Sequence, residues 1–304
     1  MNREKFTIPT PEVEELITQV LHDEPVHSGG NSLIRKALWR GQPVAIKDYT
    51  RRSDGRLRAT REWSALNFLS NSASRWAPQP FAISADHDFV VMEWIDGSTP
   101  HETLPVDSMI EILADLHHLA ECSSHSSIMS AADAIDSPND LYVQTRQRLT
   151  SLGSSDLVAQ EAQELSDFVA TRDPFGSDAA DKVATLSPSD FGPHNMLWDG
   201  NGYRLIDLEF FGWDDAHKLA ADTSLHPLIP WTHESLTEFQ EGATSLYRLD
   251  SGRLREVTQG ALIKWAAIIL ARAEREWHNG SIESHRSSVE LARSYRQRAI
   301  ELSA

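Results

Sequence analysis

The sequence predicts an α+β protein with a small antiparallel β-sheet in its N-terminal part and a larger, mainly helical C-terminal part. Four β-like runs come first, at residues 33–39, 43–49, 81–84 and 89–94. The turns at 40–42 and 85–88 are short, which favours antiparallel pairing of the runs they join. Beyond residue 95, apolar side chains recur at helical spacing, as Ile110, Leu113 and Leu116 do. The hydrophobic period therefore changes from strand-like to helical along the chain.

Length and composition are those of a soluble globular protein. The chain has 304 residues, 40% hydrophobic and 24% charged, and can bury a substantial core in one large or two medium domains. With 28 basic against 45 acidic residues, its formal charge is −17. This balance argues against a general nucleic-acid or anionic-membrane surface, which needs a basic patch. It is compatible with a cationic substrate but also with plain solubility, which we favour.

Cysteine content and the first residues point to a cytoplasmic protein. Cys122 is the only cysteine in the sequence, so no intrachain disulfide and no thiolate zinc cluster can form. The first residues lack the apolar run of a signal peptide, and no apolar stretch of about 18 residues occurs. We therefore expect a cytoplasmic protein without a membrane partner.

Local patterns justify the N-terminal elements. A threonine cap and Pro11 open an amphipathic helix that ends near Asp23. Gly29 and Gly30 then precede the first strand pair. A glycine turn at this place lets backbone N–H groups approach a phosphate, although a plain hairpin turn explains the two glycines equally well. Residues 60–69 keep a helical period and form the next predicted helix.

The C-terminal part is predicted to consist mainly of helices, at residues 107–120, 141–149, 156–171 and 282–300. His118, Cys122 and His125 are spaced i, i+4 and i+7, which could place metal ligands on one helix face. No fourth ligand lies nearby and apolar residues adjoin them, so core or surface histidines are the favoured interpretation.

Residues 186–212 contain the densest set of candidate catalytic groups. Asp190 and Asn195 lie in a loop rich in turn residues, and Asp207 follows a predicted hairpin whose turn is Asp199-Gly200-Asn201-Gly202. The hairpin brings its two ends together, and with them the three side chains. One carboxylate can orient or deprotonate an attacking hydroxyl, while an asparagine oxygen and a second carboxylate hold Mg²⁺ against nucleotide phosphates. Each residue alone would fit an ordinary turn or cap.

Asp190, Asn195 and Asp207 together resemble the catalytic loop and metal aspartate of the aminoglycoside phosphotransferase and choline kinase-like family. Its pattern is H-x-D-x-x-x-x-N followed by an I-D aspartate. Here Pro188 occupies the histidine position, which in that family mainly supports the loop. The resemblance implies a two-lobed protein-kinase-like fold, with a nucleotide-binding lobe at residues 1–95 and a catalytic and acceptor-binding lobe at residues 96–304.

The resemblance also implies roles for individual residues. Asp190 would be the catalytic base, and Asn195 and Asp207 would bind Mg²⁺, with Glu209 as a second metal or water-shell ligand or a solvated loop residue. Lys47, positioned by Glu62, would contact the phosphates of ATP. The remaining nucleotide-binding positions would be the phosphate-covering loop Gly29, Gly30, Asn31 and Ser32 and the adenine-binding hinge Glu93, Trp94 and Ile95.

The expected function is ATP- and Mg²⁺-dependent phosphorylation of a small-molecule hydroxyl, such as an amine-bearing alcohol, an aminoglycoside or a sugar. The carboxylates Asp214, Asp215, Asp222 and Glu234 tilt the expectation slightly toward an amine-bearing acceptor. The resemblance places the acceptor pocket in helices that carry Trp231, His233, Glu234, Trp265 and Trp277. The alternative is a nucleotide-binding pseudokinase or regulatory protein, motivated by Pro188 and the reduced glycine loop.

Overall fold

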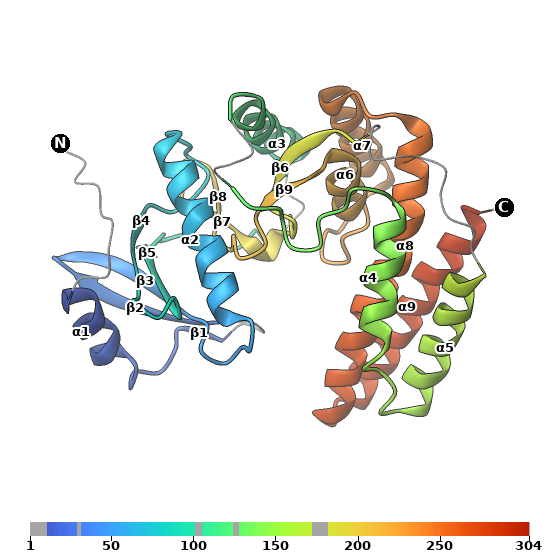
Figure 1. The fold of residues 1–304 in the computed structure, drawn as a ribbon, viewed down its shortest axis with the longest axis horizontal. Helices are drawn as coiled ribbons and strands as arrows, with labels where there is room; N and C mark the ends of the chain where they lie inside the picture. Colours follow the sequence, from blue (N-terminus) through green and yellow to red (C-terminus); the bar gives the residue numbers. More distant parts are fainter. Residues whose placement is uncertain (1–10, 29–31, 101–104, 124–127, 172–181, 304) are drawn as a thin grey trace. The chain divides into compact units, whose positions relative to one another are not determined.

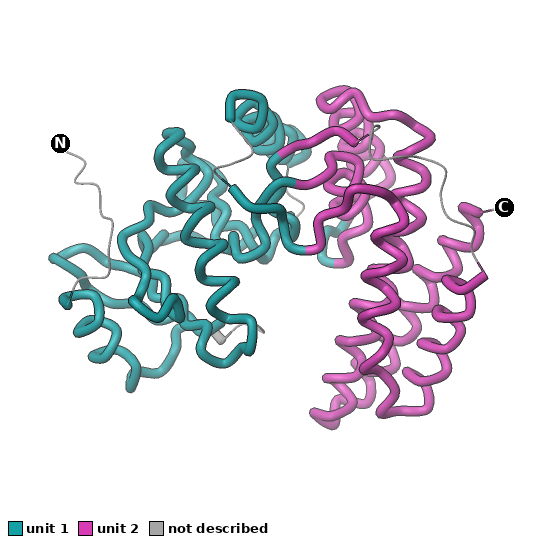
Figure 2. The backbone as a smooth tube through the Cα atoms, viewed as in Figure 1, with its two compact units in different colours: residues 1–132, 186–213, 228–230 teal, residues 133–185, 214–227, 231–304 magenta. Residues whose placement is uncertain are grey.

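The structure is a computed structural model that describes residues 11–28, 32–100, 105–123, 128–171 and 182–303 (Figure 1). Contacts within the chain divide it into two compact units, coloured teal and magenta in Figure 2. Unit 1 comprises residues 1–132, 186–213 and 228–230, and unit 2 comprises residues 133–185, 214–227 and 231–304. The chain passes between the units inside the short strands β6 (Ala184–Ser187) and β9 (Gly212–Asp215). The two lobes expected for residues 1–95 and 96–304 remain a prediction.

A five-stranded antiparallel sheet belongs to unit 1. In spatial order its strands are β1 (His27–Ser28), β2 (Leu33–Trp39), β3 (Gln42–Asp48), β5 (Phe89–Glu93) and β4 (Pro80–Ile83). Arg40 and Gly41, with φ of 51° and 79°, form the two-residue turn between β2 and β3. Such a turn matches the twist of the strands and fixes Trp39 opposite Gln42. The two predicted strand pairs are confirmed, and β3 joins them by pairing with β5.

Different helices cover the two faces of this sheet. Val44 and Ile46 of β3 pack with the apolar side chains of α1 (Pro11–Val20). Because successive side chains of a strand alternate, Lys47 points to the other face, where α2 (Gly55–Asn71) supplies its partner. α2 packs on β4 and β5 and is longer than the predicted residues 60–69. The alternation therefore buries a lysine between sheet and helix.

A long helix and a short hairpin complete unit 1. The helix is α3 (Val106–Glu121), and the hairpin consists of the 3₁₀ turn η2 (Pro193–Asn195), β7 (Met196–Trp198) and β8 (Tyr203–Leu205). Met196 pairs with Leu205 in the hairpin, which confirms the hairpin predicted to bring its ends together. The Asp199 carboxylate accepts the backbone N–H groups of Asn201 and Gly202 at 2.9 and 3.0 Å and so closes the turn.

Helices form most of unit 2. They are α4 (Asn139–Leu149), α5 (Asp156–Ala170), α6 (Ala216–Ser224), α7 (His233–Tyr247), α8 (Ser251–His278) and α9 (Ile282–Glu301). The long α8 packs against α4, α5, α6 and α9, and Figure 1 shows α4, α5, α8 and α9 side by side. Because neighbours surround it, α8 buries side chains on more than one face, among them Val257, Leu262 and Leu270.

The architecture confirms the predicted fold class. A small antiparallel sheet lies in the N-terminal part of the chain, and the rest is mostly helical. Among the helices that the structure describes, none combines the length and the apolar character that crossing a bilayer requires.

Gly260 lies where α8 packs on α4, and we predict that Gly260→Ala destabilises the protein. A Cβ at this position would lie 2.7 Å from Cδ1 and 2.9 Å from Cβ of Leu141, which is fully buried. Overpacking costs about 1–3 kcal/mol, and the ~1 kcal/mol that alanine gains over glycine in a helix offsets part of it, so we expect a net loss of about 1 kcal/mol. The thermal midpoint, followed by circular dichroism, should fall by about 2–4 °C or more.

The matched control is Ser287→Ala on the exposed side of α9, which should leave the midpoint unchanged. A Gly260→Ala protein at least as stable as the original chain would contradict this account of the α4–α8 contact.

Candidate active site

The ammonium group of Lys47 lies between two carboxylates in unit 1. Its Nζ donates to Oε1 of Glu62 at 2.8 Å and to Oδ1 of Asp207 at 2.9 Å, and the residue is only 1% exposed. Burial alone would lower the pKa of Lys47, but the charges of Asp207 and Glu62 outweigh burial, so its pKa lies above the usual value. The structure therefore joins the predicted lysine–glutamate pair to the predicted metal aspartate through one cation.

Glu62 is held from three sides. Besides Lys47, its carboxylate accepts the Tyr49 hydroxyl at 2.5 Å and the backbone N–H of Leu208 at 3.1 Å. Tyr49 directly follows β3, and Leu208 directly follows Asp207. Because Glu62 itself is fully buried on α2, it fixes the sheet, the helix and the segment after β8 to one another.

Arg58, on α2 with Glu62, is a second cation of the site, and the sequence did not predict it. Its Nη1 donates to Oε1 of Glu209 at 2.6 Å and its Nε to Asp54 at 2.7 Å. Its guanidinium also lies over the Phe210 ring, 4.7 Å from the centroid. The spacing of Arg58 from Glu62 is i, i+4, which places both on one helix face and is the signal that could have identified it.

Glu209 is a buried carboxylate in acidic surroundings. Burial and the neighbouring Asp207 raise its pKa to about 7, and Lys47 and Arg58 offset only part of this rise. The pKa of Arg58 is raised as well, chiefly by Glu209 acting against its burial, so the ion pair itself is attractive. The raised pKa of Glu209 is consistent with the raised pKa of Arg58, because Glu209 is buried and faces the carboxylates of Asp207 and Glu62 as well as two cations.

Asp190 and Asn195 lie at the two ends of one tight loop. The Asn195 side-chain amide donates to the Asp190 backbone carbonyl at 3.0 Å. The backbone carbonyl of Asn195 accepts the backbone N–H of Ile206 at 3.0 Å. The second bond ties this loop to the residue before Asp207. The Asp190 side chain is 32% exposed, so its carboxylate remains within reach of a molecule from solution.

Serine side chains support the loop at the position where the family pattern has a histidine. Ser187 accepts the backbone N–H of Ser189 at 3.0 Å, and the Ser189 hydroxyl donates to the Ala132 carbonyl at 3.1 Å. Ser189 has a φ of 68°, and the Asp190 N–H donates to the Pro188 carbonyl at 2.8 Å. The loop around Pro188 is therefore braced by local hydrogen bonds.

His194 contacts Asp190 and is a second residue that the sequence analysis missed. Its Nε2 lies 3.2 Å from Oδ2 of Asp190, four residues back along the chain. Burial opposes protonation of His194, but the Asp190 carboxylate, helped by Asp207, raises the pKa of His194 above its usual value. The side chain can therefore orient the Asp190 carboxylate.

The predicted nucleotide-binding positions are described in part. Gly29, Gly30 and Asn31 lie outside the described residues, and Ser32 is buried just before β2. β5 ends at Glu93, whose carboxylate accepts from Arg204 and from the Gln79 N–H, each at 3.0 Å. The Trp94 N–H donates to the Pro43 carbonyl at 3.3 Å, and Ile95 is buried. The roles of these residues remain predictions.

Three of the four carboxylates expected to attract an amine are buried in ion pairs within unit 2. Asp214 binds Lys218, Asp215 binds Arg253 and Asp222 binds Lys264, each at 2.6 Å, and all three acids are at most 4% exposed. The fourth, Glu234, lies exposed in the first turn of α7. The charges of these paired, buried carboxylates are neutralised within unit 2 and are not offered to an acceptor. They therefore give no support to an amine-bearing acceptor.

Among the other expected positions, those that the structure describes pack against neighbouring side chains or lie at the surface. The Cys122 sulfur lies 3.8 Å from Nε2 of His118, and His125 lies outside the described residues. Trp231 contacts the Phe239 ring in a tilted arrangement, and Trp265 meets His226 edge-to-face, with centroids 5.2 and 5.1 Å apart, as packing residues do. His233 is exposed at the start of α7, and Trp277 is 40% exposed on α8.

A comparison with models of protein families identifies the family of this chain. The family model described as the phosphotransferase enzyme family matches residues 26–257. A comparison with curated proteins finds no match.

Solved structures share the fold over nearly the whole chain. The gentamicin complex of APH(2″)-IIa aligns with a TM-score of 0.61 and 17% identity over 94% of this chain and 96% of that one. ADP-bound aminoglycoside phosphotransferase APH(2″)-Ib aligns at 0.57 and 18% over 94% and 98%. Choline kinase from Cryptosporidium parvum Iowa II aligns at 0.55 and 14% over 91% and 89%. The fold of this chain is therefore the protein-kinase-like fold of such enzymes.

Glu209→Gln should change how stability depends on pH. Because the folded-state pKa of Glu209 is raised to about 7, the folded chain binds more protons than the unfolded chain between about pH 4.5 and 7. Stability due to this group is therefore present at low pH and lost as pH rises through 7. Relative to Glu209→Gln, the original protein should lose about 1–3 kcal/mol between pH 5 and 8.

The measurement is the thermal midpoint of both proteins across this pH range, with exposed Glu283→Gln as the control. Parallel profiles for the original and Glu209→Gln proteins would contradict a raised pKa at Glu209.

Proposed function

Because the chain belongs to the phosphotransferase enzyme family, we propose that it transfers the terminal phosphoryl group of ATP to a hydroxyl group of a small molecule. The observation that carries the proposal is the Lys47 ammonium, buried between Glu62 and Asp207 at the point where the hairpin after the Asp190 loop ends. A fixed cation beside an aspartate is suited to a nucleotide that arrives with a divalent metal.

Lys47 would bind the phosphates of ATP. Glu62 keeps its ammonium in place, while Asp207 can exchange its bond to Lys47 for a bond to a metal because its side chain is 30% exposed. The backbone at Glu93, Trp94 and Ile95 would pair with the adenine edge, and the segment Gly29, Gly30, Asn31 and Ser32 would cover the phosphates. ADP is bound in one of the similar solved structures, which supports a nucleotide here.

The local charges fit a divalent cation. Three carboxylates, of Glu62, Asp207 and Glu209, face two cationic side chains, so the cluster has an excess of negative charge. Burial raises the pKa of Glu209, and the nearby Asp207 carboxylate adds to that rise. Asn195 and Asp207 would hold Mg²⁺ through hard oxygen atoms, which it prefers. When bound, the ion neutralises charge on the phosphates. Glu209, held by Arg58, would accept hydrogen bonds from its water shell.

Asp190 would act on the acceptor. Its carboxylate would orient the attacking hydroxyl and receive the proton as the oxygen forms its bond to the γ-phosphorus and the bond to the ADP oxygen breaks. His194, 3.2 Å away, would keep one carboxylate oxygen turned toward it, leaving the other for the hydroxyl. The acceptor classes we consider are alcohols that bear an amine, aminoglycosides and sugars.

Asp190→Asn should abolish phosphoryl transfer while leaving ATP binding intact. The amide keeps the size of the side chain and its contact with His194 but cannot take the proton. Loss of a general base lowers turnover by about 10²–10⁴-fold. The assay is ATP consumption across aminoglycosides, choline, ethanolamine, homoserine, thiamine and several sugars.

Undiminished turnover by Asp190→Asn with an acceptor that the original protein phosphorylates would contradict the assignment of Asp190 as the base. Silence of the original protein across the panel, with Mg²⁺-dependent ATP binding intact, would favour the nucleotide-binding regulatory alternative.

The metal requirement can be tested at Asp207. With an acceptor that is phosphorylated, turnover should vanish with EDTA and return with Mg²⁺. The Asp207→Asn protein should need a Mg²⁺ concentration higher by about tenfold or more for half-maximal turnover, since a charge-assisted contact to the metal is lost. Asp199→Asn, on the turn of the same hairpin, is the matched control. An unchanged Mg²⁺ requirement in Asp207→Asn would remove Asp207 from the metal site.

A further inference from the structure

A cavity of about 420 Å³ lies within unit 1 and is not formed by the proposed catalytic residues. Its lining comes from the β7–β8 hairpin, from α3 and from the segment before β4. None of Lys47, Glu62, Asp190, Asn195 or Asp207 contributes to it. A volume of this size falls in the range of small-molecule sites.

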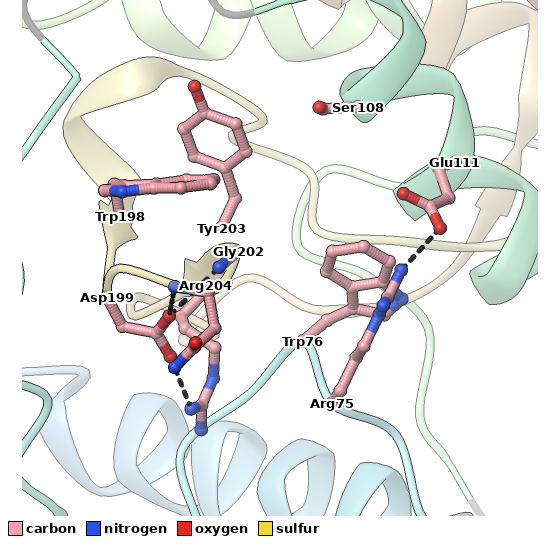
Figure 3. Close-up of a pocket in the computed structure, with 10 residues that line it drawn as sticks. Arg75, Trp76, Ser108, Glu111, Trp198, Asp199, Gly202, Tyr203 and Arg204 are labelled. Atoms are coloured by element: carbon pink, nitrogen blue, oxygen red, sulfur yellow. Dashed lines mark hydrogen bonds and ion pairs between the residues drawn. The ribbon is translucent and has the colours of Figure 1, made fainter.

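One wall of the cavity is aromatic. Trp198, at the end of β7, is 42% exposed, and its indole ring lies 5.0 Å from the Tyr203 ring in an edge-to-face arrangement. Figure 3 shows these two rings together on one side of the cavity. Because Trp198 is 42% exposed beside this edge-to-face partner, part of its ring surface is open to a stacking partner or a cation.

The opposite wall is polar and comes from α3. Figure 3 shows Ser108 and Glu111 there, with Arg75 reaching toward the Glu111 carboxylate. Both partners of this ion pair are largely exposed, 64% for Arg75 and 56% for Glu111, and such pairs contribute little to stability. Arg75 also lies 4.2 Å over the Trp76 ring. Arg75 thus keeps a partner when Glu111 turns to a ligand, which makes Glu111 the group that can accept a cation.

The floor of the cavity is rigid. Arg204 donates to Asp199 at 3.2 Å, to the Ala77 carbonyl at 2.9 Å and to Glu93 at 3.0 Å. The indole N–H of buried Trp76 donates to Asp115 at 2.7 Å. The lining holds two ion pairs: Asp199–Arg204 is held from several sides, whereas the exposed Glu111–Arg75 pair can open, so Glu111 is the carboxylate that a ligand can reach. A lining already held in place lowers the entropy lost on binding.

We propose that this cavity binds a small aromatic amine, with the ring stacked on Trp198 and the ammonium group bound by Glu111. The exposed indole selects for a flat ring, and the carboxylate opposite selects for an N–H donor of positive charge. The net charge of −17 favours the approach of such a cation. The site is separate from the proposed phosphoryl-transfer site, although Arg204 connects its floor to Glu93 at the end of β5.

The test is calorimetric titration of the full chain with three probes. Tryptamine should bind. 2-Cyclohexylethylamine, with the charge but no aromatic ring, and indole-3-acetate, with the ring but a negative charge, should each bind more weakly. Trp198→Ala should weaken tryptamine binding about 3- to 10-fold, as expected for one aromatic contact.

Two further variants locate the site. Leu291→Ala, which removes an exposed apolar side chain from α9, should leave tryptamine binding unchanged. Glu111→Gln should weaken tryptamine and abolish its advantage over indole-3-acetate. Absence of tryptamine binding, equal binding of all three probes, or tryptamine binding that is insensitive to both Trp198→Ala and Glu111→Gln would overturn the proposal.

Discussion

The structure around the candidate site depends on one buried cation. Lys47 cannot lie between a sheet and a helix without compensation, because an unpaired buried charge is costly. Glu62 from α2 and Asp207 from the segment after β8 supply that compensation, at 2.8 and 2.9 Å. Residues 160 positions apart in sequence are thereby held at one point. The same three groups that satisfy each other in the structure are those to which the proposed function assigns nucleotide and metal binding.

The neighbouring contacts follow from this cluster. Glu62 also holds Tyr49 and the backbone of Leu208, so it fixes the position of the segment that carries Asp207. Arg58 partly balances Glu209, yet the cluster keeps an excess of carboxylates, and burial together with Asp207 raises the pKa of Glu209. This excess of carboxylates over cationic side chains suits a divalent cation, which would arrive together with the phosphates of the nucleotide.

Much of this could be predicted from local sequence, and the rest depended on long-range contacts. Turn residues and strand runs predicted the sheet and the hairpin that carries Asn195 and Asp207, because those patterns act over a few residues. The contacts of Arg58 and His194 were not predicted, since a lone arginine or histidine on a helix face or loop is usually solvated. Asp215 and Asp222 were misleading because their partners, Arg253 and Lys264, lie on α8, far along the chain.

The central claim is that Lys47 binds the phosphates of a metal–nucleotide complex, and ATP binding by Lys47→Met tests it most directly. Isothermal titration of ATP with Mg²⁺ should give binding to the original protein and affinity lower by about tenfold or more in the variant, as loss of a charged hydrogen bond predicts. Circular dichroism would establish that the variant is folded. Equal affinity of both folded proteins for ATP would contradict the account.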